Sequence, residues 1–252
     1  MITEVKPISK REFSEMVYRF HYSKVLPKLT KLFLGGFEDG ELVAVMSLGW
    51  GVRPLHTIRR LFPSLTTKDY YEIGKMCLPD SLPHNSESKF ISLCMRYVRD
   101  NFSKIKLIFT WADGMLGKPG YIYQASNFLY GGYAVTDSYF TDKGEKVHPR
   151  STGSIGGRPN KKEQVALCFK HYKGRQFRFV YFLCSRRERK ELLGSSGYAW
   201  EGGGYPKDCD LKWLISTKDG WVDSGCPDYR PEERCFRRKN VDNLSPNQIA
   251  LV

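Results

Sequence analysis

The sequence predicts an α/β protein with a mixed β-sheet flanked by helices. Short apolar runs and alternating patterns indicate strands, and apolar residues spaced three and four apart indicate helices between them. The two kinds of segment alternate along the chain, as they do in sheets covered by helices. At 252 residues the chain is also long enough to bury a substantial core.

The N-terminal part predicts a strand, a helix and a hairpin. Residues 2–8 read as a strand, and a helix follows from the N-cap candidate Ser9, with Phe13 and Val17 at helical spacing. Two apolar runs then flank Asp39-Gly40. This dipeptide is favoured in tight hairpin turns because both of its residues tolerate positive φ.

The middle of the chain continues the alternation. "DYYEIGKMCLP" predicts a strand, "SESKFISLCMRYVRDNF" a helix, and "IKLIFTWAD" a buried strand that ends on Asp113. A short helix through "YIYQASNF" and a strand through "YGGYAVTDSYF" follow. The apolar face predicted for the long helix consists of Phe90, Ile91, Cys94, Tyr97 and Val98.

The last hundred residues have weaker patterns. "STGSIGGRPNKKE" indicates a flexible basic loop, "RQFRFVYFLC" a strand, and "SRRERKELLG" a basic helix ended by Gly194. From Ser195 onward the chain is expected to be irregular. We therefore expect one domain over residues 1–194 and a basic C-terminal extension, residues 195–252, packed on it.

The charge distribution indicates a polyanionic partner. The formal net charge is +13, and the segment 140–190 alone holds fourteen Lys or Arg against four acidic residues, with aromatic residues interleaved. Such a mixture suits phosphate contact and base stacking, although a strand with one solvated face gives the same alternation. The expected nucleic-acid contacts are Arg158, Lys161, Lys162, Lys173, Arg175, Arg178, Arg186 and Arg187.

Several classes of protein are disfavoured. Seven cysteines without a CxxC pair indicate a reducing compartment, not a disulfide framework or a zinc site. The charged N-terminus and the lack of a long apolar run predict a cytoplasmic protein with no membrane partner. No P-loop, no GxGxxG after a strand and no Asp-Pro-Pro-Tyr signature is present, which disfavours nucleotide hydrolysis and methyl transfer.

Five blocks in chain order carry a resemblance to a known family. They are "HYSKVLP" from His21, "LGGFEDGELVAVMSLG", "EIGKMCLPDSLPHNSESKFI", "ADGMLGKPGYIYQASNFLYGG", and "HYKGRQFRFVYFL" with "YPK" from Tyr205. The element order is similar to that of the GNAT acyltransferase fold, with a donor site between the strands on either side of the central helix. More specifically, the chain resembles the bacteriophage Mom family, GNAT-like proteins that place a carbamoylmethyl group on the exocyclic amine of adenine in DNA.

The resemblance implies a phage-encoded enzyme that modifies double-stranded DNA in the host cytoplasm and protects it from restriction nucleases. Three positions depart from the expected patterns. Lys75 stands where the family has Arg, and Lys118 where it has His. The turn "LPHNSES" also lacks the glycine with which GNAT enzymes hold the pyrophosphate of CoA. The donor is therefore expected to be an acyl-CoA or another activated compound.

The resemblance assigns catalytic roles to three residues. Asp113 would orient the adenine amine and accept its proton, although an Asp-Gly step also suits a simple turn cap. Tyr123 would stack on the extruded base or donate its hydroxyl, unless the ring is part of the core. Lys75 would neutralise charge on the donor or on a phosphate.

Further residues are expected at the donor and at a metal. Asn85, Ser86, Ser88 and Asn127 would contact the donor, while Asn85 and Ser88 also fit an ordinary helix start. His21 and Tyr22 would contact the substrate or a metal ion of unknown identity, although a lone histidine is more often structural.

Two other functions stay open at this point. One is an N-acyltransferase that acts on a protein, a tRNA or an amine, and the other is a non-enzymatic nucleic-acid-binding protein on the same scaffold. The sequence leaves the oligomeric state open, with a homodimer among the alternatives.

Overall fold

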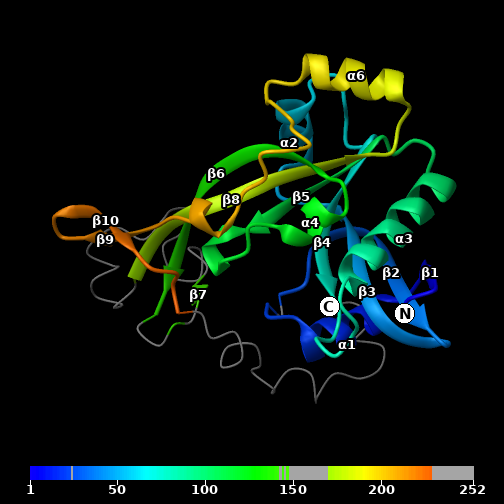
Figure 1. Ribbon diagram of the computed structural model, residues 1–252, viewed down its shortest axis with the longest axis horizontal. Helices are drawn as coiled ribbons and strands as arrows, with labels where there is room; N and C mark the ends of the chain where they lie inside the picture. Colours follow the sequence, from blue (N-terminus) through cyan, green and yellow to red (C-terminus); the bar gives the residue numbers. More distant parts are fainter. Residues whose placement is uncertain (24, 142–143, 145, 148–169, 229–252) are drawn as a thin grey trace.

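The computed structural model describes residues 1–23, 25–141, 144, 146–147 and 170–228. In chain order, its helices and strands are β1 (Glu4–Pro7), α1 (Lys10–Phe20), β2 (Leu29–Glu38), β3 (Glu41–Trp50), α2 (Pro54–Leu61), β4 (Tyr70–Cys77), α3 (Ser86–Asn101), β5 (Leu107–Asp113), α4 (Tyr121–Ala125), β6 (Leu129–Phe140), β7 (Lys146–Val147), β8 (Lys170–Phe182), α6 (Arg186–Ser195), β9 (Trp213–Thr217) and β10 (Gly220–Ser224). Figure 1 shows their arrangement.

All of these strands belong to one mixed sheet. Its order is β1-β2-β3-β4-β5-β8-β6-β7, and the β9-β10 hairpin pairs with β8. β4 and β5 form the parallel pair, and their pairing extends only from Tyr70–Glu72 on one strand to Leu107–Phe109 on the other. Beyond Glu72 and Phe109 the two strands diverge, so the sheet opens at their C-terminal ends.

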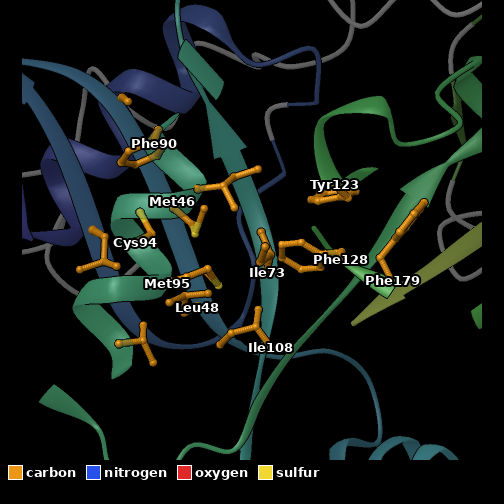
Figure 2. Packing of buried hydrophobic residues seen from close by; sticks show 14 of the residues in the cluster. Met46, Leu48, Ile73, Phe90, Cys94, Met95, Ile108, Tyr123, Phe128 and Phe179 are labelled. Atoms are coloured by element: carbon orange, nitrogen blue, oxygen red, sulfur yellow. The ribbon is translucent and has the colours of Figure 1, made fainter. Parts of the chain in front are cut away.

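Helices cover both faces of the sheet. On one face, α3 and α4 bury Phe90, Cys94 and Tyr123 against the strands, as Figure 2 shows. On the other face, α2 and α6 bury Ile58 and Leu192 in a separate cluster, and Figure 1 shows these two helices together. The two faces of the sheet therefore have separate apolar cores.

Most elements predicted from local patterns are confirmed. Ser9 caps α1 with a capping box completed by Glu12, and Asp39 and Gly40 both have positive φ in the β2-β3 turn. The predicted long helix, buried strand and short helix correspond to α3, β5 and α4. The α/β fold class, a mixed sheet flanked by helices, is therefore confirmed.

The prediction of an irregular chain from Ser195 is wrong in part. Trp213–Thr217 and Gly220–Ser224 form an antiparallel hairpin, and Tyr172–Gly174 of β8 pairs with its first strand. The basic helix also runs one residue beyond Gly194, to Ser195. The loop "STGSIGGRPNKKE" and residues 229–252 lie outside the described residues, and the domain division at Gly194 stays a prediction.

Within the described part of the chain, none of the helices is long and apolar enough to cross a membrane.

Candidate active site

A cleft of about 430 Å³ occupies the opening between β4 and β5. Backbone and side chains from the diverging halves of both strands line it, together with the turn after α1 and the start of α4. Of the residues singled out in the sequence, the cleft brings together His21, Tyr22, Lys75, Asp113, Lys118 and Tyr123. Segments that are far apart in the sequence thus meet where the sheet opens.

Asp113 is the last residue of β5 and lines the cleft. Its Oδ1 accepts a hydrogen bond from the N–H of Met115 at 3.1 Å, and its carbonyl oxygen accepts one from the N–H of Lys118 at 3.2 Å. The carboxylate therefore caps the turn that follows the strand. Asp113 is a partly buried residue of the cleft wall, and its catalytic role stays a prediction beside this capping contact.

Tyr123 reaches the cleft from α4, but its ring belongs to the core. Its ring centroid lies 5.4 Å from those of Phe128 and Phe179, and 9% of the residue is exposed. Burial raises the pKa of its hydroxyl, which also forms a hydrogen bond with Thr110. Because the two phenylalanines pack against the ring, the hydroxyl, not the ring face, is the part suited to contact a ligand.

Gly120 explains why α4 approaches β5 and β8 so closely. Its φ is +94°, and a Cβ at this position would lie 2.6 Å from the Phe179 ring and 2.9 Å from Ala112. A glycine is needed here for both its conformation and its lack of a side chain. It places Tyr123 one turn further on, beside the strand that ends at Asp113.

Lys75 fixes the turn after α1. Its Nζ donates to the carbonyl oxygen of Ser23 at 2.8 Å and lies 3.4 Å from Nδ1 of His21. The N–H of Ser23 also donates to Nδ1, at 2.9 Å. A backbone N–H can only donate, so Nδ1 is an acceptor and the neutral ring carries its proton on Nε2.

Tyr22 stands between the imidazole of His21 and a second lysine. The two rings stack with centroids 4.2 Å apart, and Nζ of Lys118 lies 4.3 Å from the Tyr22 centroid. Lys118 thus places a cation in the cleft wall at the position where the family has a histidine. A proton-shuttling role of that histidine therefore does not transfer to this residue.

The metal contact expected of His21 and Tyr22 stays a prediction, and the described surroundings of the His21 ring do not favour a cation. A metal requires the lone pair of a deprotonated ring nitrogen, whereas Nδ1 of His21 already accepts a hydrogen bond and Nε2 carries the proton. The Lys75 ammonium next to the ring would also repel a cation. Among the described residues, no group of three or more His, Cys, Asp or Glu side chains is placed to hold a metal.

A second cavity, of about 370 Å³, brings the predicted donor contacts together. Asn85, Ser86 and Ser88 at the start of α3 line it, with Asn127 just after α4. Asn85 occupies the N-cap position with φ +68° but makes no side-chain cap hydrogen bond, so the expectation that it caps the helix through its side chain is wrong. Its carbonyl oxygen instead accepts a hydrogen bond from the Ser88 hydroxyl at 3.0 Å.

The basic residues predicted to contact nucleic acid fall into three groups. Arg158, Lys161 and Lys162 lie outside the described residues. Lys173 and Arg175 lie on β8, over the rings of Trp221 and Tyr133 at 4.1 and 4.2 Å from their centroids. Their contact with DNA stays a prediction.

Arg178 and the α6 arginines differ in what they contact. The Arg178 guanidinium donates to the carbonyl oxygens of Gly131 and Tyr133 at 2.6 and 2.7 Å, which ties β8 to a bulge in β6. Arg186 and Arg187 are exposed on α6, and Arg187 forms an i,i+4 ion pair with Glu191. Arg178 therefore supports the β6-β8 pairing, the two α6 residues are exposed, and the contact of all three with DNA stays a prediction.

The sequence analysis missed Glu72, the last β4 residue paired with β5. Burial raises the pKa of its carboxyl to about 7, and the N–H of Gly51 donates to Oε2 at 3.2 Å, which partly offsets that effect. The only sequence signal was a carboxylate inside the apolar strand "YYEIGKMC".

Glu72 makes stability depend on pH. Its folded-state pKa lies above the ordinary value of 4.5, so the folded protein binds this proton more tightly than the unfolded chain does. The resulting stabilisation is fully present below about pH 4.5 and is lost as the pH rises through about 7. Glu72→Gln should remove this loss, and melting temperatures of both proteins measured across that pH range would show it. Parallel curves for the two proteins would contradict this assignment.

The diverging β4-β5 pair, the cleft at its open end and the second cavity beside α3 and α4 are the features of a GNAT-like fold. The chain belongs to the Mom protein family, whose model matches residues 3–199. It is 33% identical, over 180 residues, to the methylcarbamoylase mom of Escherichia phage Mu. The aligned region covers 68% of this chain and 71% of the relative.

Similar solved structures include an N-acetyltransferase from Staphylococcus aureus Mu50, with 16% identity and a TM-score of 0.39 over 73% of this chain and 98% of that one. Another is an acetyltransferase of the GNAT family from Streptococcus pneumoniae, with 6% identity and a TM-score of 0.39 over 71% of this chain and 98% of that one.

Proposed function

We propose that this protein modifies DNA by transferring a small acyl-derived group, of the carbamoylmethyl type, onto the exocyclic amine of adenine. The observation that carries the proposal is the position of Asp113 at the open end of the β4-β5 pair, in a chain of the Mom family. The net charge of +13 supports a polyanionic substrate. The name of the phage Mu relative, a methylcarbamoylase, supports the kind of group transferred.

The chemistry assigns distinct tasks to the residues of the cleft. Adenine's exocyclic amine is a weak nucleophile because its lone pair is delocalised into the ring. A carboxylate that accepts a hydrogen bond from the amine orients it and takes its proton as the new bond forms. In the transfer, the nitrogen bonds to the donor carbon, the leaving group departs with the electrons of the broken bond, and Asp113 takes the displaced proton.

Other cleft residues position the reactants. The buried Tyr123 hydroxyl stays protonated because burial raises its pKa, so it serves as a hydrogen-bond donor. Lys75 and the N–H of Ser23 fix the turn that holds His21 in the cleft wall. Lys118 supplies positive charge at the mouth of the cleft, where a leaving group gains negative charge.

The donor in this proposal is an acyl-CoA or another activated compound. Asn85, Ser86, Ser88 and Asn127 offer amide and hydroxyl groups around a cavity of about 370 Å³ beside the first turn of α3. Backbone N–H groups at a helix start favour an anionic group such as a phosphate. This cavity adjoins α3 and α4, the helices that cover the sheet face opposite α2 and α6.

Mass spectrometry of nucleosides from the DNA of cells that express the protein tests the proposal. The expected result is a heavier deoxyadenosine, with the other three nucleosides unchanged and with the added mass lost together with the base on fragmentation. DNA with only ordinary deoxyadenosine, from cells that contain folded protein, would contradict the proposal.

A further inference from the structure

Trp111 and Asp113 lie on the same face of β5. Side chains two residues apart in a strand point to the same side, and Trp111 packs with the cluster under α2 and α6. Tyr123 of α4 packs against the opposite face of the sheet, the face that α3 also covers. Trp111 also lines the cleft. The cleft is therefore bordered by a phenol on the side of the donor cavity and by an indole on the other side.

The indole N–H of Trp111 has no hydrogen-bond partner in the part of the chain that the structure describes. Three other tryptophans donate theirs within the protein: Trp50 to the carbonyl oxygen of Tyr70, Trp200 to the hydroxyl of Ser196, and Trp213 to the carbonyl oxygen of Met115. Trp111 is partly buried like these three. A partly buried indole usually finds an acceptor, so its N–H is suited to an acceptor brought by a ligand.

Phe109 and Arg178 are neighbours of the Trp111 indole, which also lines the cleft. Phe109 meets the indole edge-on, with centroids 5.2 Å apart and planes at 81°. The Arg178 guanidinium lies over the indole at 5.5 Å, held by the carbonyl oxygens of β6. Among the described residues, no aromatic ring stacks face to face on Trp111.

We infer that Trp111 is the stacking platform for the extruded adenine, with its indole N–H as donor to an acceptor atom of the base. This inference rests on the proposed function and deepens it. The base enters from the face under α2 and α6, its exocyclic amine reaches Asp113 two residues along the strand, and the donor arrives from the face under α3 and α4. Trp111 thus takes the stacking role for which the packed ring of Tyr123 is not suited.

The charges on this face agree with the approach of DNA. Arg60 of α2 lies close enough to Arg178 to contribute to the lowering of its pKa, after the larger effect of burial. Arg59 and Arg60 are exposed in the last turn of α2. Cations beside an aromatic platform suit an extruded nucleotide, because they neutralise the flanking phosphates while the ring holds the base.

Two measurements on three variants test the inference. The first is kcat/KM for DNA modification by Trp111→Ala, Trp111→Phe and the control Trp200→Phe, which changes another partly buried indole on the same sheet face. Stacking contributes about 1–3 kcal/mol per base, so Trp111→Ala should lower kcat/KM about 5- to 150-fold. Trp111→Phe keeps one aromatic ring but loses the N–H and part of the stacking surface, so about a 2- to 10-fold loss is expected. Trp200→Phe should stay near the wild-type value.

The second measurement is the fluorescence of DNA duplexes that carry 2-aminopurine in place of an adenine, in a set of different sequence contexts. Indole quenches 2-aminopurine on stacked contact, whereas phenylalanine does not. The signal should therefore stay low with the wild type and Trp200→Phe and rise with Trp111→Phe. This readout does not require group transfer, and a merely structural role of Trp111 would not change it.

The outcomes separate this inference from the proposed function. Equal 2-aminopurine signals for the wild type and Trp111→Phe, or wild-type kcat/KM in Trp111→Ala, would overturn the role of Trp111. If Trp111→Ala does not fold, the 2-aminopurine fluorescence with Trp111→Phe still tests whether Trp111 is the stacking platform. A signal that is low with the wild type and rises with Trp111→Phe, from a protein that transfers no group to DNA, would support the platform and contradict only the proposed reaction.

Discussion

Asp113→Asn is expected to abolish DNA modification while the protein stays folded. Asparagine keeps the size of the side chain and an oxygen that accepts a hydrogen bond from the N–H of Met115, so the turn after β5 is preserved. The amide oxygen cannot take a proton from the amine at neutral pH. General base catalysis contributes about 10²- to 10⁴-fold, so modified adenine should fall by at least about a hundredfold. Nucleoside mass spectrometry and the melting temperature of the purified variant measure both effects.

A second variant, Asp113→Ala, separates the catalytic role of Asp113 from its role as a turn cap. It removes both the carboxylate and the cap, so it should lose activity and also about 0.5–2 kcal/mol of stability. If Asp113→Asn keeps full activity while Asp113→Ala unfolds more easily, the residue is only a turn cap. In that case the catalytic role assigned to it is wrong.

Phe179→Ala is expected to have the largest effect on stability. Phe179 is fully buried, packs against Tyr123 and Tyr130, and lies where a Cβ on Gly120 would touch it. Removing a buried phenyl ring costs about 3–5 kcal/mol, because transfer energy is lost and a cavity remains. Since the ring supports α4, activity should fall with stability. Urea unfolding followed by far-UV circular dichroism measures the change.

Val135→Ala is a matched control on the neighbouring strand β6. Val135 is 61% exposed, so its truncation should change the free energy of unfolding by about 0.5 kcal/mol or less. A similar, small change in both variants would show that the core between β8 and α4 is not packed as described.

Local patterns in the sequence predicted the elements that carry their own signals. The capping box at Ser9, the Asp39-Gly40 turn and the apolar face of α3 each depend on residues a few positions apart. Asp113 was found for the same reason, because an apolar run that stops on one carboxylate marks the end of a strand. These features need no knowledge of the rest of the chain.

The features that were missed depend on distant contacts. α2 and the β9-β10 hairpin are short, and they are stabilised by the α2-α6 cluster and by pairing with β8. The role inferred for Trp111 follows from β5 lying between two helical layers and from an indole N–H that has no acceptor among the residues that the structure describes. Tyr123 looked suited to stacking until the structure placed Phe128 and Phe179 against its ring. Sequence spacing alone carries none of this information.

The central claim is that the cleft ending at Asp113 transfers a group onto the amine of adenine in DNA. The most direct measurement incubates purified wild-type and Asp113→Asn proteins with duplex DNA and a small-molecule cell extract that supplies the donor. Tandem mass spectrometry then locates any added mass. The account predicts an added group on the exocyclic nitrogen of adenine with the wild type and at most a trace with Asp113→Asn. Equal modification by both proteins, or added mass on another base, would contradict it.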